Sequence, residues 1–295
     1  MKEQRKEQFN IMAQFTNQAQ LSYNGLVINS NITVGELLDS ITADKHAVTG
    51  TYTVGDEITY VISIVSTGMS TQNNLTVTDD LGAYIAGGAT VYPLSYVSGS
   101  ITYYQNGTIQ PPPTVTVSAP LTITGITVPA GGSILLIYKA TVTQFANPNI
   151  GGTITNTATI DGACVTTPIR VTETINASAG ADLTIVKSLD PTVVTGCGAR
   201  LTYTFVIRNF GNTAAGADDS VILTDTFNPI LYGLTATRDG AALPPTAYTY
   251  SELTGQFTTA ACQIVVPAAT YTQNPVTGAW TVTPGVTTIV VTGTI

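Results

Sequence analysis

The stretch LTYTFVIRNFGNTA at residues 201–214 decides the fold, because apolar and polar side chains alternate along it until a glycine and an asparagine interrupt the pattern. A period of two is typical of a β-strand with one buried face, and glycine and asparagine favour a turn. Residues 56–68, DEITYVISIVSTG, show the same pattern much earlier in the chain. The two stretches therefore predict equivalent strands in two copies of one β-domain.

Other parts of the chain repeat as well, at a spacing of about 140 residues. LTVTDDLGAYI at 75–85 matches VILTDTFNPIL at 221–231, and GITVPAG at 125–131 matches QIVVPAA at 263–269. Turn signals about every ten residues are typical of immunoglobulin-like β-sandwiches. We therefore expect an all-β fold with two tandem immunoglobulin-like β-sandwiches. The first sandwich is predicted over residues 37–178 and the second over residues 182–295.

The composition restricts the classes of function. Hydrophobic residues make up 43% of the 295 residues, charged residues 9%, and the net charge is −8. This charge disfavours a nucleic-acid surface, and no apolar run reaches the roughly 18 residues that a membrane span needs. The first residues, MKEQRKEQFNIMAQF, carry charges and lack the apolar segment of a secretory signal. Without a nucleophile elbow, phosphate-binding loop or Cys-x-x-Cys motif, we expect no enzyme activity, no cofactor and no metal.

Two segments far apart in the chain look like versions of one hairpin. Residues 15–36 are FTNQAQLSYNGLVINSNITVGE, and residues 154–174 are ITNTATIDGACVTTPIRVTET. The dipeptides Asn-Gly at 24–25 and Asp-Gly at 161–162 favour a tight turn in which both central residues have positive φ. Each segment therefore predicts a β-hairpin, and the downstream hairpin closes the first sandwich.

The second sandwich is expected to lack its own closing hairpin. Its last strand, TTIVVTGTI at 287–295, matches SILLIYKATV at 133–142, and the sequence stops there. The upstream hairpin, predicted over residues 13–36 behind a charged arm of residues 1–12, has no such sandwich in front of it. A sandwich without this hairpin exposes an unpaired edge and an open core, so the N-terminal hairpin is expected to complete a second sandwich.

The preferred hypothesis is a structural subunit of an extracellular bacterial filament, either pilus-like or a spore appendage. In it the N-terminal hairpin of the next subunit completes the second sandwich of the subunit before it by donor-strand complementation. This contact is heterologous, so it propagates into an open homopolymer. Each buried apolar side chain would contribute about 1.5–3 kcal/mol. The residues expected at the junction are Phe15, Asn17, Ala19, Leu21, Ile28, Ile32 and Val34.

An alternative keeps the hairpin within its own chain. The N-terminal hairpin would then fold back, and the protein would be a monomeric cell-surface adhesin or binding module.

Each sandwich also has a lysine and an acid on predicted core faces. Lys45 follows Ile41 and Ala43 at a period of two, and Asp79 follows Leu75 and Val77 in the same way. Lys187 and Asp225 are their counterparts in the second copy. The hairpins add an inward asparagine, Asn156 in the first sandwich and Asn17 from a donor.

These three groups resemble the self-forming isopeptide sites of Gram-positive pilus and adhesin domains. That resemblance implies that an uncharged lysine attacks the asparagine amide while the acid moves the proton. An alternative without chemistry stays open, in which the lysine reaches the rim, the asparagine bonds the backbone and the acid begins a turn. The candidate isopeptide residues are Lys45, Asp79, Asn156, Lys187, Asp225 and Asn17.

The ordered motifs LTYTFVIRNFGNTA, VILTDTFNP, GITVPAGG and ITNTATI resemble the conserved-repeat modules of bacterial surface proteins, the family catalogued as domain of unknown function eleven. The resemblance covers about residues 38–295. It implies a β-sandwich at a bacterial cell or spore surface, and it implies no known activity.

The three cysteines, Cys164, Cys197 and Cys262, lack metal-ligand spacing, and their odd number leaves at least one without an intrachain partner. They are candidates for a disulfide between subunits.

Overall fold

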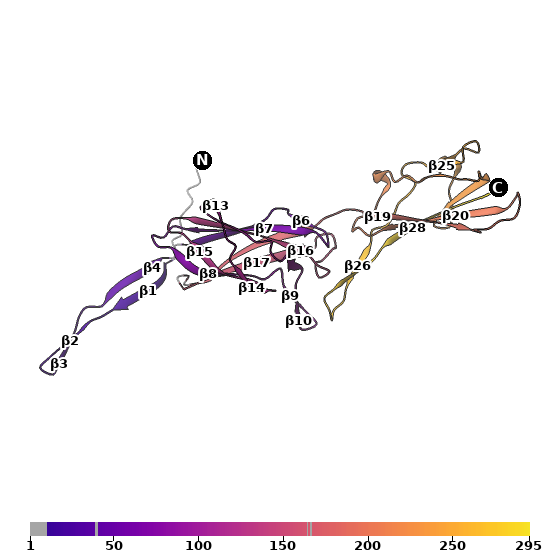
Figure 1. The fold of residues 1–295 in the computed structure, drawn as a ribbon. Coiled ribbons are helices and arrows are strands. Elements are labelled where there is room, and N and C mark those ends of the chain that lie inside the picture. The colour runs from indigo at the N-terminus through magenta and orange to yellow at the C-terminus, as the bar shows by residue number, and fades with distance from the viewer. Residues whose placement is uncertain (1–10, 39–40, 164, 166) are drawn as a thin grey trace, which may run out of the picture. The chain divides into compact units, whose positions relative to one another are not determined.

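The computed structural model describes residues 11–38, 41–163, 165 and 167–295 (Figure 1). Helical structure in this described part is limited to two short 3-10 turns, η1 (Ala217–Asp219) and η2 (Pro245–Ala247). The chain divides into two compact units, residues 1–146 with 153–176 and residues 147–152 with 177–295. The predicted all-β fold of tandem immunoglobulin-like sandwiches is confirmed.

The N-terminal hairpin consists of four antiparallel strands. They are β1 (Ile11–Asn17), β2 (Gln20–Tyr23), β3 (Leu26–Asn29) and β4 (Thr33–Leu38). β1 pairs with β4, and β2 pairs with β3. Asn24 and Gly25 form the turn with φ angles of 50° and 78°. Both residues therefore have the left-handed conformation that a primed turn requires, as predicted.

The two halves of this hairpin differ in register by one residue. Asn17 faces Thr33, whereas Gln20 faces Asn29, so the return strand contains one extra residue between these pairs. An extra residue of this kind moves every later side chain to the other face. Val34 therefore faces Thr16 and lies opposite the face of Asn17. The expectation that Val34 shares the junction face with Asn17 is wrong for this reason.

The first sandwich contains fourteen strands after the hairpin. They are β5 (Ile41–Ala47), β6 (Thr51–Tyr52), β7 (Glu57–Ser66), β8 (Gln72–Asp79), β9 (Tyr84–Ala86), β10 (Ala89–Val91), β11 (Leu94–Tyr96), β12 (Thr102–Gln105), β13 (Thr108–Gln110), β14 (Thr114–Ser118), β15 (Leu121–Val128), β16 (Ser133–Val142), β17 (Thr153–Asp161) and β18 (Ile169–Ala177). One sheet has the order β13-β12-β16-β7-β5, with β11 also paired to β16. The other has the order β14-β15-β8-β17-β18-β6. Burial alternates along β7, β8, β15 and β16, so their inward residues form the core.

The hairpin of β17 and β18 closes this sandwich, as expected, but its connection differs from the prediction. β17 pairs with β8 on one side and with β18 on the other. Residues 162–168 separate β17 from β18, and Gly162 does not have a positive φ. The Asp161 side chain accepts a hydrogen bond from the Gly162 amide, and Val165 donates to the Gly162 carbonyl. The tight turn predicted at Asp161-Gly162 is therefore wrong, because these local bonds build a longer loop.

The second sandwich repeats the order of one sheet and shortens the other. Its strands are β19 (Leu183–Asp190), β20 (Arg200–Asn209), β21 (Thr224–Thr226), β22 (Tyr232–Arg238), β23 (Ala241–Ala242), β24 (Tyr248–Tyr250), β25 (Gln256–Thr259), β26 (Thr270–Gln273), β27 (Trp280–Thr283) and β28 (Gly285–Thr294). The order β19-β20-β28-β22-β23 matches β5-β7-β16-β12-β13 of the first sandwich. The other sheet has three strands in the order β21-β25-β24, and β26 pairs with β27. The core is centred on aromatic residues such as Phe227 and Phe257.

One side of the second sandwich is open where the first is closed. In the first sandwich β8 has two neighbours, β15 and β17. Its counterpart β21 pairs only with β25 in the described chain. The exposed fraction of Leu183 on β19 is 39%, against 7% for the equivalent Ile41 on β5. The position that β17 covers in the first sandwich is therefore uncovered in the second.

Candidate functional site

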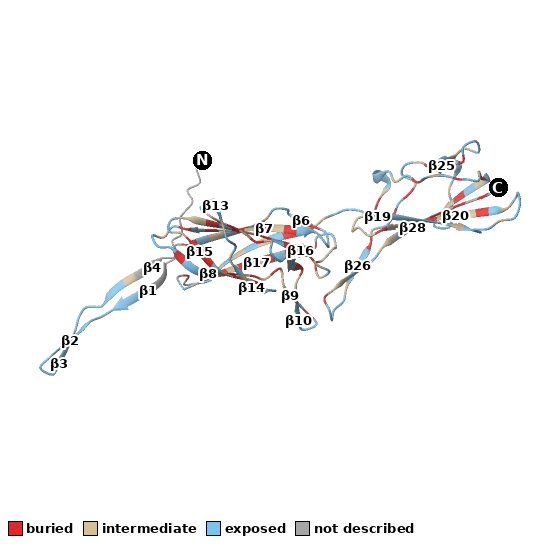
Figure 2. Cartoon of the chain, viewed as in Figure 1, coloured by how far each residue is buried: buried red, intermediate tan, exposed pale blue. Residues whose placement is uncertain are grey.

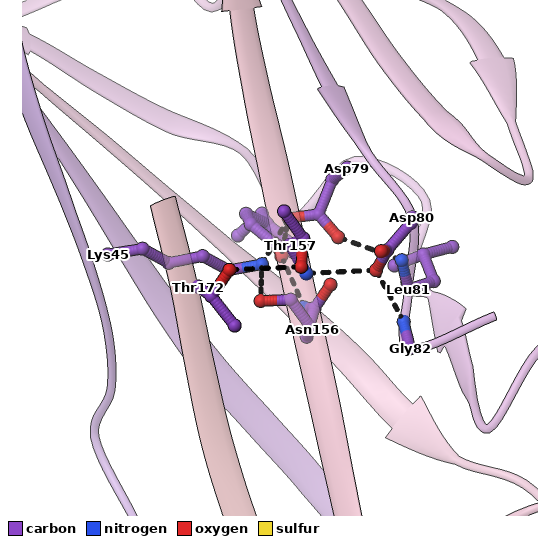
Figure 3. Close-up of polar contacts among 9 residues, drawn as sticks. Lys45, Asp79, Asp80, Leu81, Gly82, Asn156, Thr157 and Thr172 are labelled. Carbon is purple, nitrogen blue, oxygen red and sulfur yellow. Dashed lines mark hydrogen bonds and ion pairs between the residues drawn. The ribbon is translucent and has the colours of Figure 1, made fainter. Parts of the chain in front are cut away.

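Three strands of the first sandwich bring Lys45, Asp79 and Asn156 together, and we call these residues the first triad (Figure 3). Lys45 lies on β5, Asp79 ends β8 and Asn156 lies on β17. Each occupies an inward position of its strand's alternating pattern. All three are buried, with exposed fractions of 2%, 0% and 0%. The structure thus places an amine, an acid and an amide in one buried cluster.

Hydrogen bonds link the first triad to Tyr138 on β16. Lys45 Nζ lies 2.7 Å from Asp79 Oδ2 and 3.1 Å from the main-chain oxygen of Asn156. The Tyr138 hydroxyl donates to Asp79 Oδ2 at 2.5 Å and accepts a bond from Asn156 Nδ2 at 3.2 Å. The Asn156 Oδ1 atom is buried without a hydrogen-bond partner among the described residues. A buried carbonyl without a partner costs about 1–3 kcal/mol.

Burial dominates the electrostatics of the pocket. Removal from water lowers the pKa of Lys45 below its usual 10.5, while the neighbouring Asp79 opposes that shift. Burial also raises the pKa of Tyr138 well above its usual value, and Asp79 adds to that effect. Lys45 Nζ lies 5.0 Å from the centre of the Tyr60 ring. Burial therefore shifts Lys45 toward its uncharged amine and Tyr138 toward its protonated phenol.

Asp80 holds the asparagine strand in place. One of its carboxylate oxygens accepts hydrogen bonds from the Gly82 and Thr157 amides, each at 2.9 Å. Because Thr157 follows Asn156 directly, these bonds fix the position of β17 beside the end of β8. The sequence pattern did not identify Asp80 or Tyr138 as members of the site. The alternation along SILLIYKATV does place Tyr138 on the core face, which is a usable signal.

An amine, a carboxamide and an acid in a dry pocket are the groups that amide-bond formation needs. The uncharged amine can attack the amide carbon, and the acid can carry a proton to the departing nitrogen. In the structure Lys45 donates to the main-chain oxygen of Asn156, so the lysine amine reaches β17 at the residue that carries the carboxamide.

The second sandwich contains an incomplete version of the triad. Lys187 on β19 pairs with Asp225 on β21, and its Nζ lies 4.8 Å from the centre of the Tyr203 ring. Within the described chain its hydrogen bonding involves Asp225 alone. The Lys187 side chain is 42% exposed, whereas that of Lys45 is fully buried. Val291 faces Tyr203 where Tyr138 faces Tyr60, so this site also lacks the phenol.

An apolar groove lies beside this incomplete site, and we call it the acceptor groove. Its volume is about 180 Å³. It is lined mainly by Leu183, Ile185, Ile207, Val221, Leu223 and Ile264. Leu183 and Ile185 precede Lys187 on β19, and Val221 and Leu223 precede Asp225. The groove therefore runs between the two strands that carry the lysine and the acid.

The N-terminal hairpin presents apolar side chains to solvent. Figure 2 shows β2 and β3 as exposed along their whole length. The exposed fractions are 62% for Phe15, 63% for Leu21 and 58% each for Ile28 and Ile32. Asn17 and Ala19 are exposed as well. Among the described residues, no strand outside the hairpin pairs with it.

The cysteines do not form a pair within the described chain. Cys197 and Cys262 are exposed and free, and Cys164 lies outside the described residues. No cluster of at least three histidine, cysteine or acidic side chains suited to a metal occurs among the described residues. No helix in that part of the chain is long and apolar enough to cross a membrane.

Comparisons with known proteins give weak likenesses. No protein-family model and no curated protein matches the chain, so the resemblance to the conserved-repeat modules stays a prediction. The major pilin subunit of Bacillus cereus is similar at 12% identity, over 91% of this chain and 70% of that one, with a TM-score of 0.37. The pilus backbone of Streptococcus pneumoniae is similar at 12% identity, over 83% of this chain and 55% of that one, with a TM-score of 0.34.

A family 123 glycoside hydrolase from Clostridium perfringens is also similar, at 10% identity, with a TM-score of 0.31. That match covers 48% of this chain and 27% of the hydrolase. The chain thus spans about a quarter of the hydrolase and about half of the Streptococcus pneumoniae protein. TM-scores this low carry no argument about function.

Proposed function

We propose that the protein is a structural subunit of an extracellular bacterial filament. The acceptor groove of one subunit takes up the N-terminal hairpin of the next, which supplies the strands that β17 and β18 supply in the first sandwich. Each added subunit is then bound through its hairpin, and its own acceptor groove is free to bind the hairpin of another copy. Because donor and acceptor are different surfaces of one chain, the contact repeats without closing.

The single observation that carries this proposal is the pair of complementary exposed surfaces. The acceptor groove is apolar, and the edge of β21 has unpaired backbone groups on the side that β17 covers in the first sandwich. The hairpin exposes Phe15, Leu21 and Ile28 without a partner in the described chain. Exposed strand edges and apolar patches of this kind usually mark an interaction site. A hairpin from another copy satisfies both surfaces at once.

The alternative function is a monomeric adhesin or binding module whose hairpin occupies its own groove. It predicts the same buried residues, but no dependence of assembly on protein concentration. Size-exclusion chromatography and negative-stain microscopy of the full-length chain over a range of concentrations separate the two functions. Filaments that lengthen with concentration support the proposal, whereas a compact monomer at all concentrations supports the alternative.

The variant Phe15→Asp tests the donor directly. It places a charge where the proposal buries a phenyl ring, and an unpaired buried charge is strongly unfavourable. Filaments should fail to form, while the circular dichroism of the two sandwiches stays near native. Thr16→Asp is the matched control, because Thr16 lies on the opposite face of the same strand. Equal assembly of the two variants would contradict a junction buried on the Phe15 face.

We also propose that the first sandwich seals itself with an amide bond. Lys45 Nζ bonds to the Asn156 side-chain carbon, and the bond from that carbon to Nδ2 breaks. Asp79 takes a proton from the lysine and passes it to the departing nitrogen. The net change converts a lysine ammonium and a carboxamide into a secondary amide and an ammonium ion. This bond would tie β5 to β17.

A further inference from the structure

The second sandwich holds two of the three groups that form the first triad. Lys187 and Asp225 occupy the strand positions of Lys45 and Asp79 and are paired in the same way. The lysine nitrogen lies 4.8 Å from the Tyr203 ring centre, close to the 5.0 Å between Lys45 and Tyr60. The amide is the group that this site does not have in the described chain.

The N-terminal hairpin carries an asparagine at the matching place. In β17 Asn156 lies two residues after Ile154 on the face that enters the core, and both are buried. In β1 Asn17 lies two residues after Phe15, so both share one face of the hairpin. Asn17 faces Thr33 across the strand pair and is exposed. A hairpin seated in the acceptor groove as β17 is seated in the first sandwich brings Asn17 to Lys187.

The open site is not ready for reaction before docking. Water reaches the Lys187 side chain, which is 42% exposed, whereas the Lys45 side chain is fully buried. A docked strand would remove that water, as β17 does at Lys45. Desolvation then favours the uncharged amine that can attack a carboxamide. Docking thus supplies both the missing reactant and the dry environment.

We infer that Lys187 of one subunit forms an amide bond with Asn17 of the next subunit, with Asp225 as the proton carrier. The inference rests on the proposed function, since the hairpin must dock before the bond can form. The bond joins Lys187 Nζ to the Asn17 side-chain carbon, and the bond from that carbon to Nδ2 breaks. As in the first sandwich, lysine ammonium and carboxamide give a secondary amide and an ammonium ion. No oxidant or cofactor is needed.

The junction bond is expected to form more slowly than the bond in the first sandwich. Tyr138 contacts both the acid and the amide there, whereas Val291 occupies the corresponding place in the second sandwich. The first triad is also assembled within one folded unit, which gives a very high effective concentration. A delay between assembly and covalent closure is therefore part of the inference.

The test uses full-length filaments boiled in detergent with reductant. Wild-type protein should give a ladder of covalent multimers, and Lys187→Met and Asn17→Ala should each give monomers only. Asn29→Ala should keep the ladder, because Asn29 lies on the opposite face of the hairpin from Leu21. Reductant excludes the exposed Cys197 and Cys262 as the cause of a ladder.

Co-assembly of the two single variants gives a sharper result. A bond can form only where Lys187 of the Asn17→Ala subunit meets Asn17 of the Lys187→Met subunit. The alanine at position 17 of one subunit and the methionine at position 187 of the other cannot react. The largest covalent species should therefore be a dimer. A ladder beyond the dimer would overturn the assignment of these two residues.

Mass spectrometry of digested wild-type filaments tests for the bond between Lys187 and Asn17 even if a variant does not assemble. We expect one peptide containing Lys187 joined to one containing Asn17, lighter than their sum by one ammonia. Filaments that form but dissolve into unmodified monomers would overturn the inference and leave the proposed function intact. A chain that stays monomeric and never forms filaments would overturn both.

Discussion

At the residue scale, Lys45 experiences two opposing effects. Burial disfavours its charge, and Asp79 at 2.7 Å favours it. A buried ion pair of this kind adds little net stability compared with apolar residues, but the loss of one partner is costly. The amide bond proposed for this pocket gives the buried lysine a role that does not depend on the stability of the ion pair.

The variant Lys45→Met tests this explanation. The intact mass of the wild-type chain should be lower than that of its sequence by one ammonia, and the variant should match its own sequence. The variant should also be less stable than the wild type, because it loses the covalent tie between β5 and β17. Lys139→Met is the control, since Lys139 pairs with Glu57 at the surface and should leave the ammonia loss unchanged. A wild-type mass equal to the mass calculated from its sequence would contradict the proposed bond between Lys45 and Asn156.

The variant Asn156→Ala keeps Lys45 as a titratable amine. Because burial lowers the folded pKa of Lys45 below 10.5, the unfolded chain binds more protons between those two values. The free energy of unfolding should therefore rise with pH across that window. Urea unfolding at about pH 8 and about pH 10 measures the rise. The double variant Asn156→Ala with Lys45→Met should lack the part of this rise that comes from Lys45. An equal rise in the free energy of unfolding in both variants would contradict a lowered pKa of Lys45.

At the scale of the element, the N-terminal hairpin is organised by its turn. Two exposed strand pairs without a sheet beside them have only marginal stability in water. The turn residues therefore contribute a larger share of the hairpin's stability than they would in a buried hairpin. Gly25 has φ +78°, a conformation that L-residues rarely adopt, and no heavy atom lies within 4 Å of the place where a Cβ would stand. A substitution there changes backbone conformation alone.

The variant Gly25→Val should therefore weaken the donor without any steric clash. The strained conformation costs about 1–2 kcal/mol, more for a β-branched residue. We expect a critical concentration for assembly raised by roughly tenfold, measured by light scattering, because about 1.4 kcal/mol is a factor of ten. Gly50→Val is the control, since Gly50 also has open space but no positive φ. Unchanged assembly of Gly25→Val would show that the hairpin turn does not limit docking.

At the scale of the whole molecule, the two sandwiches differ in completeness. In the first sandwich β17 lies beside β8, and Lys45 is buried. In the second sandwich β21 is an edge strand, and Lys187 is partly exposed. An uncovered core exposes apolar residues such as Ile185, which is 53% exposed. The second sandwich should therefore be the less stable unit in the free subunit.

A peptide of residues 13–36 should stabilise that unit by mass action. Added to the Phe15→Asp protein, it should raise the melting temperature of the second sandwich and leave that of the first unchanged, because a ligand that binds only the folded form stabilises it. At a peptide concentration about one hundred times its dissociation constant the gain is about 2.7 kcal/mol. Differential scanning calorimetry measures both transitions. The same peptide with Phe15→Asp is the control, and no shift with either peptide would contradict donation.

The sequence by itself determined the strands, the repeat and the residues that belong together. Alternation of apolar and polar side chains fixes which residues face a core, so Lys45, Asp79 and Asn156 could be placed on inward faces without a structure. Local rules also determined the turn at Asn24-Gly25, where both residues need positive φ. They failed at Asp161-Gly162, where hydrogen bonds with neighbouring residues selected a longer loop.

Only the tertiary structure decided the relations between strands. The extra residue in the return strand of the hairpin moved Val34 to the other face, and register of this kind depends on pairing rather than on the pattern of one strand. Tyr138 and Asp80 joined the site because β16 and β8 pack around β17. Lys187 is partly exposed whereas Lys45 is buried, because no strand covers Lys187 among the described residues of the second sandwich. The missing hairpin was predicted from the repeat, but the exposed fraction of each lysine depends on how the strands pack.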